Sequence, residues 1–189
     1  MRNFSFSRIR SILLFIPVFF LLFSCKKDNN TPPPETPELK LWCGDFENRQ
    51  CVLDHWSIDT LTVSWSIVDS SYNGSHSLYM NVKSPIYFQM VTTVEGIEPD
   101  STYEIGFHTK LKSEPQNHNP SLVMVVYNGN QDYLQDFVVY SDTAQAVVDV
   151  DWMPYIFTVT NDTSTSLTLQ IAANYLGEVW LDQMYIKKL

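Results

Sequence analysis

Short runs of alternating apolar and polar residues recur after residue 40, and this pattern limits the fold more than any other feature of the chain. The alternating segments are residues 61–67, 103–109, 155–159 and 167–172. A period of two turns one side of a strand toward a core and the other toward solvent or a ligand. No segment in this part of the chain keeps a helical period for three turns, and turn-forming pairs such as Asn73-Gly74 separate the runs. We therefore predict an all-β protein built as a two-sheet sandwich.

One further segment differs from the alternating ones. Residues 122–127 are apolar throughout except for the hydroxyl of Tyr127. A continuous apolar run of this length predicts a strand that is covered on both faces.

The first 24 residues have the pattern of an export signal. Three arginines precede an apolar run at residues 12–23, which is shorter than the ~20 residues that a membrane-spanning helix needs. The run ends in Leu22-Phe23-Ser24-Cys25, which resembles a bacterial lipobox with a bulkier residue than usual at Phe23. The resemblance implies that Cys25 receives a lipid and begins the mature protein. A secreted protein with an unrelated cysteine is the alternative.

Residues 25–39 are interpreted as a lipid-bearing cysteine followed by a tether. Four prolines lie in the thirteen residues from Lys26 to Glu38, which favours an extended and semi-rigid segment. At ~3.1 Å per residue it would hold a domain roughly 40 Å from its lipid. The charged run Lys26-Lys27-Asp28 resembles the export signals of surface-displayed lipoproteins of Gram-negative bacteria. It implies an anchor in the outer membrane and exposure at the cell surface.

The charge of the chain excludes several classes of partner. Without Arg2, Arg8 and Arg10, nine basic residues face 21 acidic ones, which gives a net charge of −12. Nucleic acid needs clustered Lys or Arg on the protein surface, so it is a poor partner. Acidic polysaccharides and anionic lipid headgroups are disfavoured for the same reason. Neutral ligands and divalent cations stay compatible with this surface.

Two cysteines remain once Cys25 is assigned to lipid. An even pair in an exported domain favours a disulfide between Cys43 and Cys51. A zinc site is the competing interpretation, but the four histidines show no metal-ligand spacing with these cysteines.

A set of short motifs runs through the rest of the chain in a fixed order. They are Gly44-Asp45-Phe46-Glu47, Trp56, residues 72–78 (Tyr-Asn-Gly-Ser-His-Ser-Leu), residues 96–103, Trp152-x-x-Tyr155-x-Phe157 and residues 177–184. In this order they resemble the carbohydrate-binding modules of families 4, 9 and 22. The resemblance covers nearly all of residues 41–189 and implies a jelly-roll β-sandwich similar to galactose-binding domains, here expected at residues 40–189.

The resemblance also implies a structural calcium ion near the chain ends. The matching positions are Glu47 and Asp182, and Asp45 is a further oxygen ligand at this end. Calcium takes six to eight oxygen ligands that converge from several segments. Gln183 replaces a second family aspartate, which leaves one anionic ligand fewer. Solvated acids, or acids that cap strand ends, are the alternative.

A sugar-binding face needs planar amides and flat aromatic rings. In related modules polar side chains on the concave sheet bind the sugar, and Gln170 lies on the outward side of residues 167–172. Its expected companions are Tyr87, Gln89, Tyr127, Tyr133 and Trp65. Trp65 shares its side of a strand with Val63 and Ile67, so a position in the core is the alternative for this residue.

Other aromatic residues lie at motif positions and are assigned to the core. They are Trp56, Tyr103, Phe107, Trp152 and Phe157.

No catalytic motif accompanies these features. The chain has no Gly-x-Ser-x-Gly, and its six glycines form no phosphate-binding loop. Asp149 and Asp151 are interpreted as a polar loop edge before Trp152, not as a glycosidase pair. The sequence thus favours a non-catalytic, surface-tethered lipoprotein that binds a neutral polysaccharide. A structural or adhesive envelope protein that uses the same sandwich for protein contacts is the alternative.

Overall fold

A computed structural model divides the chain into two units, residues 1–35 and 36–189. The residues that it describes all belong to the second unit and are 38–39, 43–59, 61, 63–82, 88–113, 121–141, 148–174 and 177–189. The predicted export signal, Cys25, most of the tether and Tyr87 lie outside the described residues.

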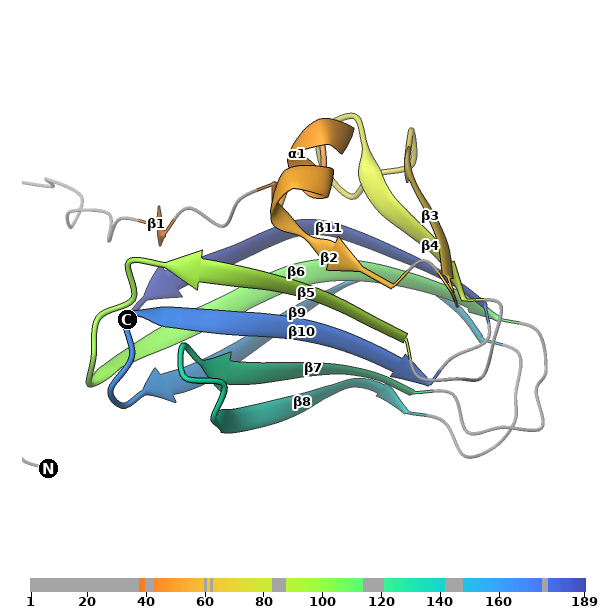
Figure 1. The fold of residues 1–189 in the computed structure, drawn as a ribbon. Coiled ribbons are helices and arrows are strands. Elements are labelled where there is room, and N and C mark those ends of the chain that lie inside the picture. Colours follow the sequence, from red (N-terminus) through yellow and green to blue (C-terminus); the bar gives the residue numbers. More distant parts are fainter. Residues whose placement is uncertain are drawn as a thin grey trace, which may run out of the picture. The chain divides into compact units, whose positions relative to one another are not determined.

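Two antiparallel sheets make up the second unit (Figure 1). The six-stranded sheet has the order β3-β4-β11-β6-β9, with β1 beside β11. Its strands are β1 (Glu38–Leu39), β3 (Val63–Val68), β4 (Ser77–Val82), β6 (Ser101–Ser113), β9 (Val148–Asn161) and β11 (Gly177–Lys188). The five-stranded sheet has the order β2-β5-β10-β7-β8. Its strands are β2 (Ser57–Ile58), β5 (Phe88–Glu95), β7 (Ser121–Asn128), β8 (Tyr133–Ser141) and β10 (Ser166–Asn174). The predicted all-β jelly-roll sandwich is confirmed.

A single short helix, α1 (Arg49–His55), interrupts the strands of the described residues. The side chain of Asn48 accepts hydrogen bonds from the backbone N–H groups of Gln50 and Cys51, as an N-cap residue does. Cys51 on this helix forms a disulfide with Cys43, with a Cα–Cα distance of 5.8 Å. The disulfide predicted from the sequence is therefore present, and it fastens the helix to the segment before it.

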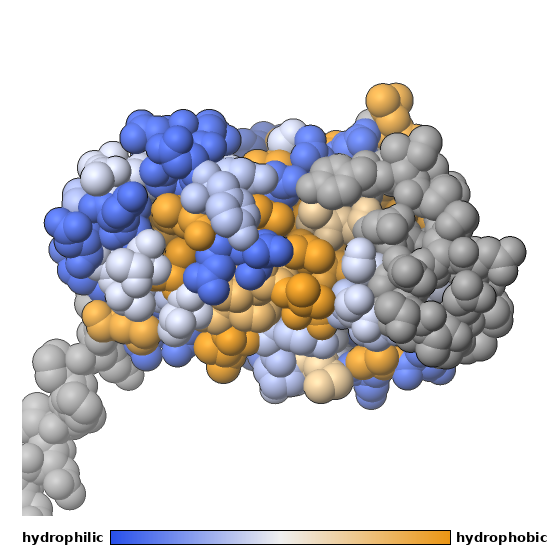
Figure 2. Space-filling view, turned by 90° about the horizontal axis from the view of Figure 1, so that it is seen from below, coloured by the Kyte–Doolittle hydropathy of each residue, from blue (hydrophilic) through white to orange (hydrophobic). Residues whose placement is uncertain are grey.

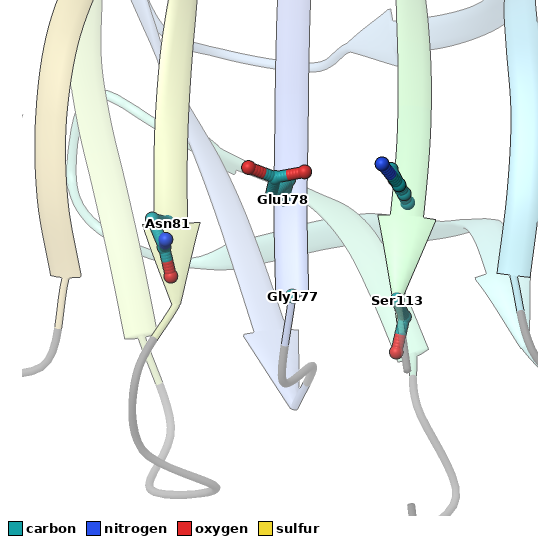
Figure 3. A pocket seen from close by; sticks show the side chains of 5 residues that line it. Asn81, Ser113, Gly177 and Glu178 are labelled. Atoms are coloured by element: carbon teal, nitrogen blue, oxygen red, sulfur yellow. The ribbon is translucent and has the colours of Figure 1, made fainter. Parts of the chain in front are cut away.

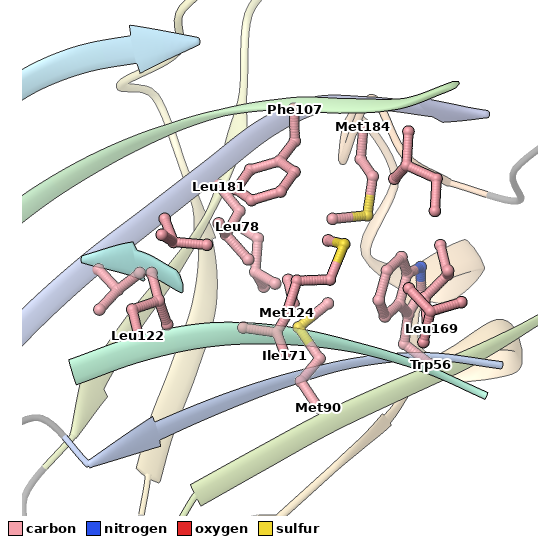
Figure 4. Packing of buried hydrophobic residues seen from close by; sticks show 14 of the residues in the cluster. Trp56, Leu78, Met90, Phe107, Leu122, Met124, Leu169, Ile171, Leu181 and Met184 are labelled. Atoms are coloured by element: carbon pink, nitrogen blue, oxygen red, sulfur yellow. The ribbon is translucent and has the colours of Figure 1, made fainter. Parts of the chain in front are cut away.

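Apolar side chains from both sheets meet between the layers and form one core. Met90, Met124 and Ile171 of the five-stranded sheet approach Leu78 and Phe107 of the six-stranded sheet (Figure 4). All five are at most 1% exposed, and burial of side chains of this size stabilises a fold by about 1.5–3 kcal/mol each. The described members of this core all lie between residues 43 and 186, within the second unit of the chain.

Most of the aromatic residues predicted for the core lie there. Trp56, Tyr103 and Phe107 are buried, and Phe157 packs against the core from a partly buried position.

Trp152 is the exception, and its assignment to the core is wrong. The pairing of β6 with β9 shifts between Thr109 and Leu111, where Met153 and Val150 are the partners. The shift begins only beyond Met153, and Trp152 is three positions from Tyr155, which packs against the core, so alternation along β9 turns Trp152 to the outer side of the strand. Trp152 is consequently only partly buried, and its ring meets the ring of Tyr72, a residue half exposed to solvent.

A second irregularity on β11 connects the two ends of the sandwich. The register with β6 shifts between Asp182 and Tyr185, and Gln183 adopts a left-handed φ of 51°. The backbone N–H of Met184 donates to the carbonyl of Gly44 over 2.8 Å. The bulge thus joins the last strand to the first turn of the described sandwich and turns Asp182 toward the loop before β4.

Within the described part of the chain, no helix combines the length and the apolar character needed to cross a membrane.

Candidate functional site

The outer face of the five-stranded sheet carries most of the residues that the sequence predicted for sugar binding. β10 is the central strand of this sheet, and its inward residues Leu167, Leu169 and Ile171 are at most 1% exposed. The alternate residues Thr168, Gln170 and Ala172 therefore face outward, yet they are only 4–9% exposed. The side chains at the centre of the face are largely covered by their neighbours, whereas Gln89 on β5 and Tyr133 on β8 are exposed.

An amide pair lies near the centre of this face. Nε2 of Gln170 donates to Oε1 of Gln89 over 3.2 Å, which joins β10 to β5. Nε2 of Gln131 likewise donates to the hydroxyl of Thr168 over 3.3 Å. Each primary amide carries two donors and an acceptor with two lone pairs, which is the chemistry that pairs with the hydroxyl groups of a sugar.

An aromatic pair lies on the same face beside the amides. Tyr127 on β7 is directly opposite Thr168 in the β10 pairing and opposite Tyr133 in the β8 pairing. The two tyrosine rings are edge to face with centroids 6.3 Å apart. The Tyr133 hydroxyl donates to Asp136, and this hydrogen bond raises the pKa of Tyr133 above its ordinary value. The side chain is 58% exposed, so its ring is available to a ligand.

The structure thus brings together Gln170, Gln89, Tyr127 and Tyr133, four of the six residues predicted for ligand binding. Tyr87 lies outside the described residues.

Trp65 is separated from the other four. It lies on β3 of the other sheet, packs against the core, and has the Arg49 guanidinium 5.2 Å from its ring centroid. This position agrees with the alternative given for Trp65 from the sequence, which was a place in the core on the same side of the strand as Val63 and Ile67.

Two further contributors to this face were not singled out from the sequence. Thr168 is one, and alternation with Gln170 was the available signal. The other is the pair Val123 and Val125, because the apolar run on β7 was expected to be covered on both sides. Both valines are only partly buried, and they add an apolar surface beside Gln170.

The residues predicted to bind calcium lie around the loop of residues 69–76. Oε1 of Glu47 accepts the backbone N–H groups of Ser75 and His76, at 2.7 and 3.1 Å. Oε2 of Glu47 lies 2.9 Å from Nδ1 of His76. Gly74 has φ +85°, and a Cβ at this position would lie 2.3 Å from Oε1 of Glu47. The loop therefore needs glycine here both for its backbone conformation and for the approach of the carboxylate.

Asp182 holds the other side of the same loop. Its Oδ2 accepts the backbone N–H groups of Tyr72 and Asn73, at 2.8 and 3.0 Å, and its Oδ1 accepts that of Gln183. The side chain is fully buried, and this burial raises the pKa of the Asp182 carboxyl above its ordinary value despite the three N–H donors.

These contacts do not fit a calcium site. All four oxygens of Glu47 and Asp182 face an N–H group, whereas calcium needs free oxygen ligands. Asp45 contributes only a long 3.4 Å contact with the N–H of Glu47. A calcium ion would have to displace several N–H donors of the loop before these oxygens could bind it.

One group of metal-ligand side chains is close enough to share an ion among the described residues, and it consists of Cys43, Cys51 and His55. The two cysteines are oxidised to a disulfide, which leaves no thiolate for zinc.

The hydrogen bond between Glu47 and His76 shifts the pKa values of both side chains. It lowers the pKa of Glu47, aided by the two backbone N–H donors, and it raises the pKa of His76. Asp69 lies 3.3 Å from the other ring nitrogen of His76 and acts in the same direction.

Comparison with known proteins identifies the fold. The sequence matches no protein-family model, and no curated protein matches it. Among the solved structures that are similar to it are one binding domain and parts of two enzymes. The CBM22-1 xylan-binding domain of Paenibacillus barcinonensis Xyn10C is 18% identical with a TM-score of 0.55, and the match covers 82% of this chain and 96% of that domain. An arabinose-bound GH51 α-L-arabinofuranosidase is 10% identical with a TM-score of 0.59, over 82% of this chain. The active domain of bacteriophage CBA120 tailspike protein 4 is 13% identical with a TM-score of 0.56, over 77% of this chain.

The chain spans 27% of the arabinofuranosidase and 20% of the tailspike chain, but nearly the whole xylan-binding domain. The fold is therefore the jelly roll of the carbohydrate-binding modules, as the sequence motifs implied.

Proposed function

We propose that this protein binds a neutral polysaccharide without catalysis, through the outer face of the five-stranded sheet. The observation that carries the proposal is the gathering of the Gln170–Gln89 amide pair and the Tyr127–Tyr133 ring pair on one face of a carbohydrate-binding-module jelly roll. The amides pair with sugar hydroxyls, and the rings and valines lie against the C–H surface of the sugar.

The expected affinity is micromolar or weaker. Each hydrogen bond to a sugar replaces one to water and contributes only about 1 kcal/mol net. A handful of such contacts must also offset the entropy that is lost on association. The net charge of −12 expected for the lipidated form disfavours sulfated and uronic polymers, so the ligand class is a neutral β-glycan of plant or algal type.

Affinity electrophoresis of residues 36–189 against neutral and acidic polysaccharides tests this proposal. Retardation is expected with neutral xylan or another neutral β-glycan, and the Gln170→Ala and Tyr127→Ala variants should each be retarded less. Gln50→Ala is a matched control, because Gln50 is an exposed glutamine on α1 that is hydrogen-bonded to Asp54 and does not belong to the five-stranded sheet. A folded protein that no neutral glycan retards would contradict the proposal.

We further propose that Cys25 carries a lipid and that the proline-rich tether presents the sandwich at the outer surface of the cell. The sequence is the support for this part. A sugar-binding domain held in this way retains a polysaccharide close to the cell envelope, where degrading enzymes or transporters act on it.

One observation favours the alternative of protein contacts. Both edge strands carry an exposed apolar side chain, Val138 on β8 at 61% exposure and Ile156 on β9 at 60%. Figure 2 views the sandwich from the β8 side and shows apolar residues across the middle of this face, with hydrophilic residues around them. Absence of glycan binding, together with loss of a protein contact in Val138→Asp and Ile156→Asp variants, would support this second function.

A further inference from the structure

The six-stranded sheet carries a separate feature on its own outer face. A hollow of about 260 Å³ lies at one end of β4, β11 and β6 and is lined by Asn81, Lys112, Ser113, Gly177 and Glu178. Figure 3 shows Asn81 on β4, Glu178 on the neighbouring β11 and Ser113 at the end of β6 around this hollow. It belongs to the opposite sheet from the Gln170 face and shares no residue with it.

The strand register explains why these side chains meet. Glu178 on β11 is directly opposite Asn81 on β4 and Lys112 on β6. Two residues further along, Trp180 is directly opposite Tyr79 and Lys110. Directly opposed residues have Cβ atoms about 4.5–5.5 Å apart, so the two rows form a continuous surface across three strands.

A chain of hydrogen bonds orients the polar row. The Tyr79 hydroxyl donates to Oε1 of Glu178 over 2.7 Å and accepts from Nδ2 of Asn81 over 3.3 Å. Partial burial and the Glu178 carboxylate both raise the pKa of Tyr79, so the phenol keeps its proton and remains the donor. The carboxylate of Glu178 is thereby fixed between an amide on one side and the Lys112 strand on the other.

The second row provides an aromatic surface beside the hollow. The rings of Tyr79 and Trp180 lie 5.1 Å apart at an angle of 52°, and both residues are partly exposed. Nζ of Lys110 lies 5.7 Å from the Trp180 ring centroid and 3.5 Å from a carboxylate oxygen of Asp151. The position of Lys110 is thus set by contacts on two sides.

We infer that this hollow is a second carbohydrate site, for one neutral pyranose unit with unsubstituted adjacent hydroxyls. A carboxylate, an amide and an ammonium group offer acceptors and donors to neighbouring hydroxyls, and Trp180 with Tyr79 offers an apolar ring surface. The volume is smaller than that of a pocket for a drug-sized ligand, which fits a single sugar unit. The site is independent of the Gln170 face.

The charges around the hollow select a neutral sugar. Lys110 and Lys112 face the carboxylates of Glu178 and Asp151 and, directly opposite Lys112, Asp149. Two positive and three negative groups leave no excess of positive charge to hold a uronate or a sulfate.

Amide chemical shifts of ¹⁵N-labelled residues 36–189 test the inference site by site. The probes are the methyl β-pyranosides of xylose, glucose and galactose, together with xylohexaose. At least one probe should shift the amides of Asn81, Lys112 and Glu178. Glu178→Gln should weaken this response about tenfold or more, because a hydrogen bond to a charged group is lost. Lys112→Met should weaken it as well, without a change in the fold.

The matched control is Glu104→Gln. Glu104 lies on the same outer face and also accepts a tyrosine hydroxyl, from Tyr185 over 2.9 Å, but it lies near the other end of β6 and β11. This variant should leave the response at the hollow unchanged. Gln170→Ala should remove only the shifts on β5, β10 and β7, so failure of the first face and failure of this hollow are separate results. Unshifted amides at Asn81, Lys112 and Glu178 with every probe, or a response that Glu178→Gln and Lys112→Met leave intact, would overturn the inference.

Discussion

Glu47 and His76 are joined by a 2.9 Å contact between Oε2 and Nδ1, although 29 positions separate them in the sequence. The same carboxylate accepts the backbone N–H of His76, so one glutamate holds both the main chain and the side chain of this residue. The loop before β4 is therefore fastened to the first turn of the sandwich through an ionisable histidine, and the hydrogen bond to Glu47 raises the pKa of this histidine.

This pair predicts a pH-dependent contribution to stability. The pKa of His76 is raised in the folded state, so its contribution is fully present below the unfolded value of about 6.5 and is lost as the pH rises through the folded pKa. The pKa of Glu47 is lowered, so its contribution is present above the unfolded value of about 4.5 and is lost as the pH falls through the folded pKa. We expect His76→Ala to lower the Tm of residues 36–189 more at about pH 5.5 than at about pH 8.

Comparing the Tm of the His76→Ala variant with that of the parent protein separates the effect of His76 from that of His108. Burial lowers the pKa of His108, so this residue favours the folded state as the pH rises, which is the opposite sign. Asp69→Asn is a control with a small expected effect, because Asp69 is almost fully exposed. A Tm difference between His76→Ala and the parent that does not vary with pH would contradict the prediction.

A chelator tests whether the carboxylates of Glu47 and Asp182 bind calcium or only accept hydrogen bonds from the loop. Because backbone N–H groups and His76 already face the carboxylate oxygens, we expect EDTA to leave the Tm of residues 36–189 unchanged. A bound calcium ion predicts the other result, in which EDTA lowers the Tm and the response disappears in Glu47→Ala and Asp182→Ala. Differential scanning calorimetry with and without added calcium measures the effect.

The alternation of apolar and polar residues was the sequence signal that predicted most of the fold. The alternating segments at residues 103–109 and 167–172 lie on β6 and β10, which are interior strands of the two sheets. The same pattern correctly placed Gln170 on an outer face. Trp152 was assigned to the core from its motif position, whereas alternation with Tyr155, which packs against the core three positions further on, places it on the outer side of β9.

The hollow at Glu178 was missed for a different reason. Its members come from three strands that lie far apart in the sequence, and only the β4-β11-β6 order brings them together. The His76 contact likewise depends on how a loop folds back on Glu47. Periodicity within a segment predicts which side of a strand a residue faces, but it carries no information on which strands are neighbours.

Removal of the disulfide should weaken the sandwich without unfolding it. The bond closes a short loop, with a sequence separation of 8 between Cys43 and Cys51. Loss of this constraint on the unfolded chain should cost about 2–3 kcal/mol in the free energy of unfolding. Urea denaturation of the Cys43→Ser/Cys51→Ser double variant measures the loss. Two free thiols in unreduced peptides of the exported parent protein would contradict the assignment.

The proposed lipid anchor has a direct cellular test. Cys25→Ser should move the protein out of the membrane fraction, because the apolar run at residues 12–23 is too short to span a bilayer as a helix. Ser24→Ala is a matched control next to the modified position and should leave the fractionation unchanged. A Cys25→Ser protein that stays with the membranes would show that another segment anchors it.

Phe107 on β6 and Trp152 on the partner strand β9 should differ sharply in their contribution to stability. Phe107 on β6 is 1% exposed and stacks against Tyr155 with ring centroids 5.7 Å apart. Its replacement by alanine leaves a cavity in the core and should cost about 3–5 kcal/mol in the free energy of unfolding. Trp152 lies on the outer side of the bulge and meets only the edge of the Tyr72 ring among its aromatic contacts in the described residues. Trp152→Ala should therefore cost about 1 kcal/mol, in the range of a surface aromatic contact. Urea denaturation of both variants measures the two losses side by side. Equal losses would mean that Trp152 contributes to the core.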